Sequence, residues 1–257
     1  MTIAAGFLCS DGVVVAADRQ ITSPTYTFPE CKLSSFYWGN GRGILAYAGN
    51  RDAHVEFDKQ LWVRFPCNAD IDAQDMPRIL EEALKAAIQK KESFAAFFGF
   101  WIDQRPLPSL LMISAQGIGN VRVTDVQEFE VIGCADSPLS RFLLGNLQAS
   151  GGRSMTVHQA MIYAVRIIGA SEVYDGQFVG GGIDAMSVSH RPDIGKLGVG
   201  VLDHGRSKEW QEEIRLMDYW SEVLFRELTD SKKELDMGQF MEEVKRFRAW
   251  VCGDLAK

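Results

Sequence analysis

Short apolar runs separated by turn-forming residues dominate the start of the chain. Residues 3–9 and 13–17 are two such runs, and Ser10-Asp11-Gly12 separates them. Asp-Gly between apolar runs is a strong short-range signal for a β-hairpin. The pattern therefore predicts that Thr2 opens a strand and that the returning strand brings Asp18 back beside it.

Further along, strand-like apolar runs alternate with apolar residues at helical spacing. Helices are predicted at 50–65, 76–91, 138–149 and 156–170, and strands at 32–38, at 43–49, in short runs up to Ile132, at 183–189 and at 197–202. This order is the one expected for two stacked sheets that helix pairs cover on both sides. The sequence thus predicts an α+β fold.

The C-terminal part of the chain differs in character. Residues 207–257 are strongly charged and contain two stretches with helical spacing of apolar residues. We therefore predict one domain at 1–206 and a C-terminal helical extension at 207–257. The apolar face of this extension either packs on its own domain or contacts a partner. Its three tryptophans, Trp210, Trp220 and Trp250, favour burial of that face in both cases.

Composition and charge narrow the class of protein. The 257 residues carry a formal net charge of −7, and the pI is about 5.2. No basic stripe or nucleic-acid-binding motif is present, so no nucleic-acid partner is expected. The apolar run at 94–102 is too short to span a membrane, and the amino terminus lacks a signal-peptide pattern. We therefore expect a cytoplasmic protein without a membrane segment.

The cysteines give no sign of a metal or disulfide framework. They are Cys9, Cys31, Cys67, Cys134 and Cys252. Their odd number and scattered spacing, without C-x-x-C, argue against disulfides and against a zinc site. No spacing ties a histidine to one of them as nucleophile and base. We therefore expect neither a metal nor a cofactor.

Thr2 is the leading candidate for chemistry. Removal of Met1 would leave a threonine with both a hydroxyl and a free α-amine, whose pKa of roughly 7.7 to 8.0 lets it accept a proton near neutral pH. Threonine paired with its own terminal amine is a known type of activated nucleophile. A small second residue is common and usually has no catalytic role. Whether Thr2 is catalytic therefore depends on the motifs that accompany it.

Several motifs accompany Thr2 in a fixed order. They are residues 2–6 (TIAAG), 11–19 (DGVVVAADR), 31–33 (CKL), 46–53 (AYAGNRDA), 133–137 (GCADS) and 179–184 (VGGGID). Together they resemble proteasome β-type subunits and their bacterial relatives, over roughly residues 2–203. The match has no gap from Thr2 to Arg19, whereas the interval from Asp18 to Lys32 is slightly shorter than in that family.

The resemblance implies a fold and an activity. The fold would be a four-layer αββα sandwich of two antiparallel sheets, as in N-terminal-nucleophile hydrolases, and the activity that of a threonine-type peptidase or amidohydrolase. Thr2, exposed by removal of Met1, would be the nucleophile. Asp18 and Lys32 would be its charged partners, and the backbone N–H of Gly49 would donate to the oxyanion.

The supporting positions of the site match the family less well. Cys134 stands near the family's serine in the middle glycine turn. Asp175 or Gly176 stands near its supporting aspartate, and Val179 or Gly180 falls where a second serine is expected. Loss of such supporting hydrogen bonds can loosen a nucleophile and slow it.

The resemblance also implies partners, and it leaves two alternatives open. Copies of the chain would assemble into rings or a helical array, with the helices at 52–65 and 138–149 as the contact surface. The substrate would be a peptide or an unfolded protein, and an unfoldase partner would remain to be identified. Alternatively, the chain is an inactive structural subunit of such an assembly, or a hydrolase of a non-peptide amide.

Overall fold

The computed structural model describes most of the chain. The described ranges are 2–22, 25–88, 93–103, 105–117, 119–133, 155–174, 179–191, 196–229 and 237–251. Two candidate site residues, Cys134 and Asp175, lie outside these ranges, and so does the helix predicted at 138–149.

The N-terminal hairpin forms the centre of the first five-stranded sheet. β1 (Ile3–Leu8) pairs antiparallel with β2 (Gly12–Asp18), with Ala4 opposite Ala17, which confirms the predicted hairpin. The strand order is β10-β1-β2-β11-β12, with β10 at Phe129–Gly133, β11 at Ile183–Arg191 and β12 at Lys196–Leu202. Every residue of β2 is buried. Because both faces of this strand are covered, its sequence is a continuous apolar run without alternation.

The second five-stranded sheet is a meander. Its order is β5-β6-β7-β8-β9, with β5 at Leu33–Trp38, β6 at Gly41–Gly49, β7 at Ser93–Ile102, β8 at Ser109–Gln116 and β9 at Val121–Asp125. Each strand pairs antiparallel with its neighbour in sequence.

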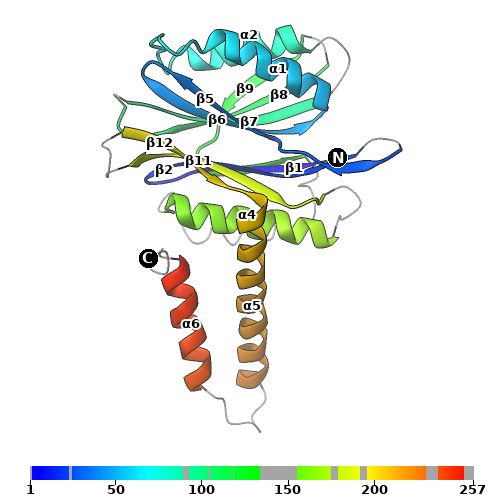
Figure 1. The fold of residues 1–257 in the computed structure, drawn as a ribbon, viewed down its shortest axis with the longest axis vertical. Coiled ribbons are helices and arrows are strands. Elements are labelled where there is room, and N and C mark those ends of the chain that lie inside the picture. The colour runs from blue at the N-terminus through cyan, green and yellow to red at the C-terminus, as the bar shows by residue number, and fades with distance from the viewer. Residues whose placement is uncertain are drawn as a thin grey trace.

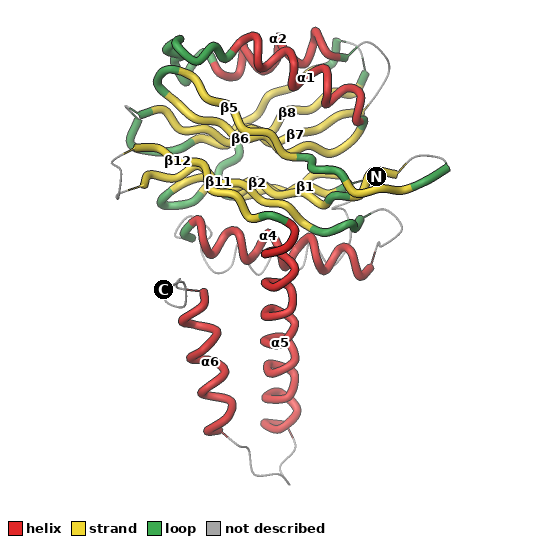
Figure 2. The backbone as a smooth tube through the Cα atoms, viewed as in Figure 1, coloured by secondary structure: helices red, strands yellow, loops and turns green. Residues whose placement is uncertain are grey.

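Helices cover the outer face of each sheet. α1 (Arg51–Arg64) and α2 (Met76–Ala87) lie on the second sheet, and α4 (Val157–Tyr174) lies on the first (Figure 1). Buried side chains that include Val13, Val15 and Ile44 fill the space between the sheets. Figure 2 shows the resulting order of layers, αββα. The predicted α+β sandwich of two antiparallel sheets is thus confirmed.

The ends of three helices differ from the prediction by one to four residues. α1 begins at Arg51 because the Asn50 side chain caps it, accepting a hydrogen bond from Ala53 N at 3.0 Å. α2 ends at Ala87, short of the predicted residue 91, because Ile88 turns to extended backbone with ψ of 104°. α4 continues to Tyr174, past the predicted residue 170.

Two long helices complete the described part of the chain. α5 (His204–Thr229) leaves the sandwich beside α4, and α6 (Met237–Val251) lies alongside α5 (Figure 1). Ile214 of α5 is buried in the apolar cluster that α4 forms with the first sheet. The first half of α5 therefore packs on the chain's own sandwich. Among the described helices, none is both long enough and apolar enough to cross a membrane.

Candidate active site

Thr2, Asp18 and Lys32 lie in direct contact. The Thr2 hydroxyl donates a hydrogen bond to Asp18, and Lys32 Nζ donates to Thr2 Oγ1. Lys32 Nζ also donates to Asp18 Oδ1 at 2.7 Å. The exposed fractions are 5% for Thr2 and 1% for each of the other two residues, so this polar cluster is shielded from bulk water. The structure thus brings together the three residues that the sequence motifs singled out.

Both sheets contribute to this cluster. Thr2 precedes β1 and Asp18 ends β2, so the register of the hairpin sets them side by side. Lys32 precedes β5 of the other sheet, where its carbonyl accepts a hydrogen bond from Tyr47 N at 3.4 Å. The Lys32 side chain therefore crosses from one sheet to the other to reach Asp18.

The Asp18 carboxylate is held by backbone donors as well as by the two side chains. Oδ1 accepts a hydrogen bond from Ile3 N at 3.0 Å, and Oδ2 accepts from Gln20 N at 3.1 Å and Gly180 N at 3.4 Å. A buried charge is tolerated when it is both paired and hydrogen-bonded. Asp18 meets both conditions, so its position relative to Thr2 is fixed.

Gly49 marks the turn from the second sheet into α1. It ends β6 with φ of +122°, in the left-handed region that favours glycine. A Cβ at this position would lie 2.7 Å from Ser93 O. The N-terminus of α1 begins directly after the turn, and its partial positive charge favours a nearby anion. Gly49 lines the same cavity as Thr2 and Lys32.

The glycine turn at 180–182 supports Asp18 through its backbone. The carbonyls of Gly180 and Gly182 accept hydrogen bonds from Arg19 N at 3.1 and 2.9 Å. Gly180 stands at one of the two positions where the second serine is expected, and it offers Asp18 an N–H but no hydroxyl. A Cβ at this position would lie 2.8 Å from Gln20 Oε1, so a side chain fits there only if Gln20 moves.

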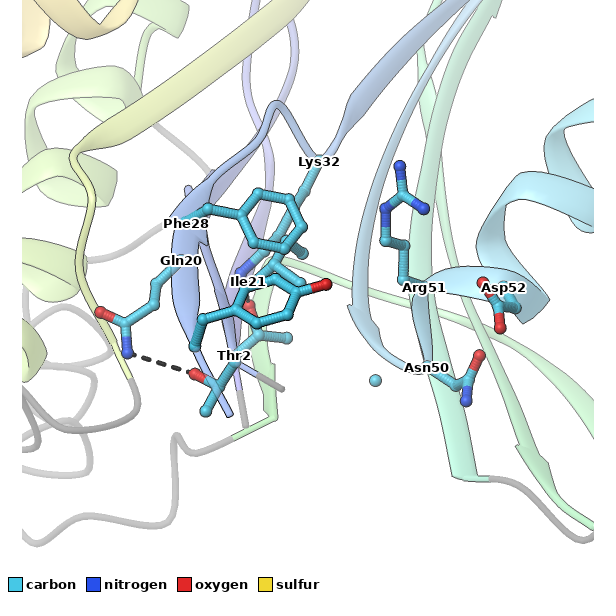
Figure 3. A pocket seen from close by; sticks show the side chains of 11 residues that line it. Thr2, Gln20, Ile21, Phe28, Lys32, Asn50, Arg51 and Asp52 are labelled. Carbon is cyan, nitrogen blue, oxygen red and sulfur yellow. Dashed lines mark hydrogen bonds between the residues drawn. The ribbon is translucent and has the colours of Figure 1, made fainter. Parts of the chain in front are cut away.

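The cluster opens on a cavity of about 470 Å³, which we call the Thr2 cavity. Figure 3 shows Gln20, Ile21 and Phe28 on one side of it and Asn50, Arg51 and Asp52 on the other. The other lining residues are Thr2, Thr22, Tyr26, Lys32 and Gly49. A volume of this size is in the range of small-ligand sites and can hold a substrate side chain beside the Thr2 hydroxyl.

The wall formed by a short β-ribbon was not predicted from the sequence. β3 (Gln20–Thr22) and β4 (Thr27–Pro29) form a two-stranded sheet among the described strands, with Ile21 opposite Phe28. Strands of three residues are too short for alternation to reveal them. The signal that could have indicated this wall is the pair of aromatic residues, Tyr26 and Phe28, in an otherwise polar loop.

A bidentate ion pair was also missed. Arg51 Nε donates to Glu30 Oε2 at 2.5 Å, and Arg51 Nη2 donates to Glu30 Oε1 at 2.7 Å. These contacts lower the pKa of the Glu30 carboxyl. Because Glu30 lies shortly before Lys32 and Arg51 shortly after Gly49, the pair ties together the two segments that carry those residues. Bidentate geometry makes such a contact stronger than an ordinary surface ion pair.

The cysteines near the start of the chain do not compete with Thr2 as nucleophile. Burial raises the pKa of the Cys9 thiol and also that of the Cys31 thiol. A reactive cysteine requires the opposite shift, because the thiolate is the nucleophile. Neither residue lines the Thr2 cavity.

The layers define the class of fold: a four-layer αββα sandwich of two antiparallel five-stranded sheets. No protein-family model matches the chain, and no curated protein matches its sequence. Solved structures do match it. The Anbu (Gly-1) mutant from Hyphomicrobium sp. strain MC1 has a TM-score of 0.68 and 19% identity, covering 92% of this chain and 100% of that one.

Two further Anbu structures are similar. The helical assembly of the Anbu complex from Pseudomonas aeruginosa has a TM-score of 0.66 and 17% identity, over 91% of this chain and 98% of that one. Anbu from Yersinia bercovieri, described as an ancestral β-subunit, has a TM-score of 0.63 and 16% identity, over 91% of this chain and 100% of that one. At these identities the likeness shows a common fold.

Proposed function

We propose that the chain is a threonine-type N-terminal-nucleophile hydrolase that cleaves amide bonds in a peptide or an unfolded protein. The observation that carries this proposal is the buried contact of Thr2 Oγ1 with Asp18 and Lys32 beside the Thr2 cavity. Buried lysine and aspartate pairs also occur as structural elements. A structural pair, however, has no need to converge on a hydroxyl that lines a cavity.

The proposed reaction begins once the bond between Met1 and Thr2 is cleaved. Thr2 Oγ1 attacks the substrate carbonyl carbon, and the freed Thr2 α-amine takes the hydroxyl proton. Lys32, held charged by Asp18, keeps the pKa of this amine low by like-charge repulsion and stabilises the oxyanion, to which the Gly49 N–H also donates. The protonated amine gives its proton to the leaving nitrogen as the C–N bond breaks. Water then hydrolyses the Thr2 ester and restores the hydroxyl.

Labelling with a threonine-directed electrophile, read by intact mass, tests this proposal. We expect one adduct per chain, confined to molecules that lack Met1, because the Thr2 nitrogen of an uncleaved chain is an amide and cannot act as a base. A Thr2→Val variant keeps the side-chain shape but lacks the hydroxyl, so it should gain no adduct. Absence of labelling in chains shown to lack Met1 would contradict the proposal and favour an inactive structural subunit.

We propose further that copies of the chain assemble. One of the structures with a similar fold is a helical assembly of the Anbu complex. The outer side of α1, a helix expected at the contact surface, exposes Val55, Trp62 and Val63 by 37%, 48% and 77%. These residues share one side of the helix, since their spacing is i, i+7 and i+8. Gathered exposed apolar residues are typical of interfaces.

Sedimentation velocity measures this assembly directly. We expect wild type to sediment well above the 28.6 kDa of a single chain at micromolar concentration. A Val63→Lys variant should shift the distribution toward smaller species, because it places a charge in the apolar patch. Lys85→Glu on α2 provides a control for a charge change on an exposed helix position. A clean monomer of the wild-type chain would refute the assembly.

A further inference from the structure

The charges that line the Thr2 cavity are not all balanced. Three charged side chains line it: Lys32, Arg51 and Asp52. Lys32 is paired with Asp18 at 2.7 Å, and Arg51 is paired with Glu30 through two hydrogen bonds at 2.5 and 2.7 Å. By contrast, Asp52 forms no hydrogen bond or ion pair with a side chain in the described ranges, and its charge interacts with that of Arg51 without direct contact. The lining therefore retains one carboxylate without a direct ionic partner, on which the Arg51 charge and the N-terminus of α1 act only at longer range.

An aromatic wall lies on the other side of the cavity from this carboxylate. Phe28 lies in β4 and Tyr26 directly precedes that strand, and their ring centroids are 5.7 Å apart. Tyr26 is 62% exposed, so its ring is accessible to a ligand in the cavity. Figure 3 shows Phe28 on the ribbon side of the cavity and Asp52 at the first turn of α1. Aromatic faces together with a carboxylate form the set of groups that binds an organic cation.

We propose that the Thr2 cavity selects substrates with a basic side chain on the residue whose carbonyl Thr2 attacks. This inference rests on the proposed function and names its substrate class. Asp52 supplies the charge, and the rings of Tyr26 and Phe28 supply the face on which the cationic side chain packs. Thr2, Gly49 and Asp52 all line the same cavity of about 470 Å³, so a side chain bound there lies beside the nucleophile.

The positive charge of Arg51 opposes a preference for basic side chains. Its pairing with Glu30 determines how strongly that charge acts in the cavity. In bidentate contact with Glu30 it forms a compact pair of opposite charges. The field of such a pair falls off faster with distance than the field of the single charge on Asp52. A cation in the cavity is thus attracted by Asp52 more than it is repelled by Arg51. The net charge of −7 on the whole chain acts in the same direction.

Binding to the Thr2→Val variant tests the preference without requiring turnover. The probes are three peptides that differ only at the residue before the target amide: lysine, norleucine or glutamate. We expect the lysine peptide to bind roughly fivefold more tightly than the norleucine peptide, because one exposed contact between opposite charges contributes about 1 kcal/mol. The glutamate peptide should bind most weakly. Asp52→Asn should remove most of the difference between lysine and norleucine. Glu56→Gln, on the same helix but outside the cavity lining, should leave it unchanged.

Different outcomes separate this inference from the proposed function. Equal binding of the lysine and norleucine peptides, a preference for glutamate, or an unchanged preference in Asp52→Asn would each overturn the inference. Cleavage of the matching peptide amides by processed wild type is then measured separately. Selective binding of lysine without cleavage of any of the three would contradict the proposed function alone, whereas cleavage of all three at equal rates would contradict the inference alone.

Discussion

Replacing Lys32 with methionine is expected to reduce electrophile labelling of Thr2 by at least ~100-fold, the usual effect of losing one charged or hydrogen-bonding group from an anion-stabilising site. The substitution removes the cation that lowers the pKa of the Thr2 amine and stabilises the oxyanion. The fold should persist, because methionine fits an apolar environment and Asp18 keeps its other donors. These are the Thr2 hydroxyl and the N–H groups of Ile3, Gln20 and Gly180.

Asp18→Ala should lower the stability of the fold more than Lys32→Met does. It leaves the Lys32 ammonium in a place where its side chain has an exposed fraction of 0%. Removing one partner of a buried ion pair lowers the free energy of unfolding by about 3 to 5 kcal/mol, because the other charge is left unpaired. Lys32→Met should lower it less, because Asp18 stays hydrogen-bonded. Urea unfolding of both variants, beside their labelling, measures this order. Equal labelling of wild type and Lys32→Met would mean that the pair is only structural.

The local sequence pattern was sufficient to predict those parts of the fold that form between residues close in sequence. The hairpin around Ser10-Asp11-Gly12 was predictable because two apolar runs lie directly on either side of a turn signal. α1 could be located from the Asn50 cap, and α2 from apolar residues at helical spacing. The order of these elements then indicated two stacked sheets between helical layers.

Contacts between the two sheets were not accessible to the same reasoning. Lys32 and Asp18 meet because the sheets stack, and the periodicity of neither strand encodes that meeting. Only the resemblance of ordered motifs to a known family placed them in one site. No motif indicated the contact of Glu30 with Arg51, 21 residues apart.

The burial of His54 was hidden for a related reason. α1 buries His54 and Phe57 but leaves Val55, Trp62 and Val63 exposed. Its apolar residues therefore do not form a single stripe, and the spacing alone does not tell which side faces the sheet. Only the packing of the helix on the second sheet reveals that a histidine lies in the core.

That buried histidine should make the protein sensitive to acid. The His54 ring stacks on Tyr47 at 3.7 Å between ring centroids, and none of the described residues forms a hydrogen bond with Nε2. Burial lowers the pKa of His54 from 6.5 to about 4, against smaller opposing effects of Asp58 and Glu30. His54 is therefore neutral in the folded protein at pH 7.

The sign of the effect follows from proton binding. Below pH 6.5 the unfolded chain protonates His54, whereas the folded protein does so only as the pH approaches about 4. The unfolded state thus binds more protons in this interval, and the free energy of unfolding falls as the pH is lowered. At about 1.4 kcal/mol for each unit of pKa difference, the loss amounts to about 3 kcal/mol.

A His54→Phe variant isolates this contribution, because phenylalanine can keep the stacking on Tyr47 but does not titrate. Urea unfolding is measured from pH 7 to pH 4 for wild type, His54→Phe and a control, His190→Gln, which alters an exposed histidine on β11. Over this range the free energy of unfolding should fall by about 3 kcal/mol more for wild type and the control than for His54→Phe. The carboxylates contribute equally in all three proteins, so the difference reports His54. Parallel pH profiles for wild type and His54→Phe would show that protonation of His54 does not couple to folding, and would contradict its burial as a neutral ring against Tyr47.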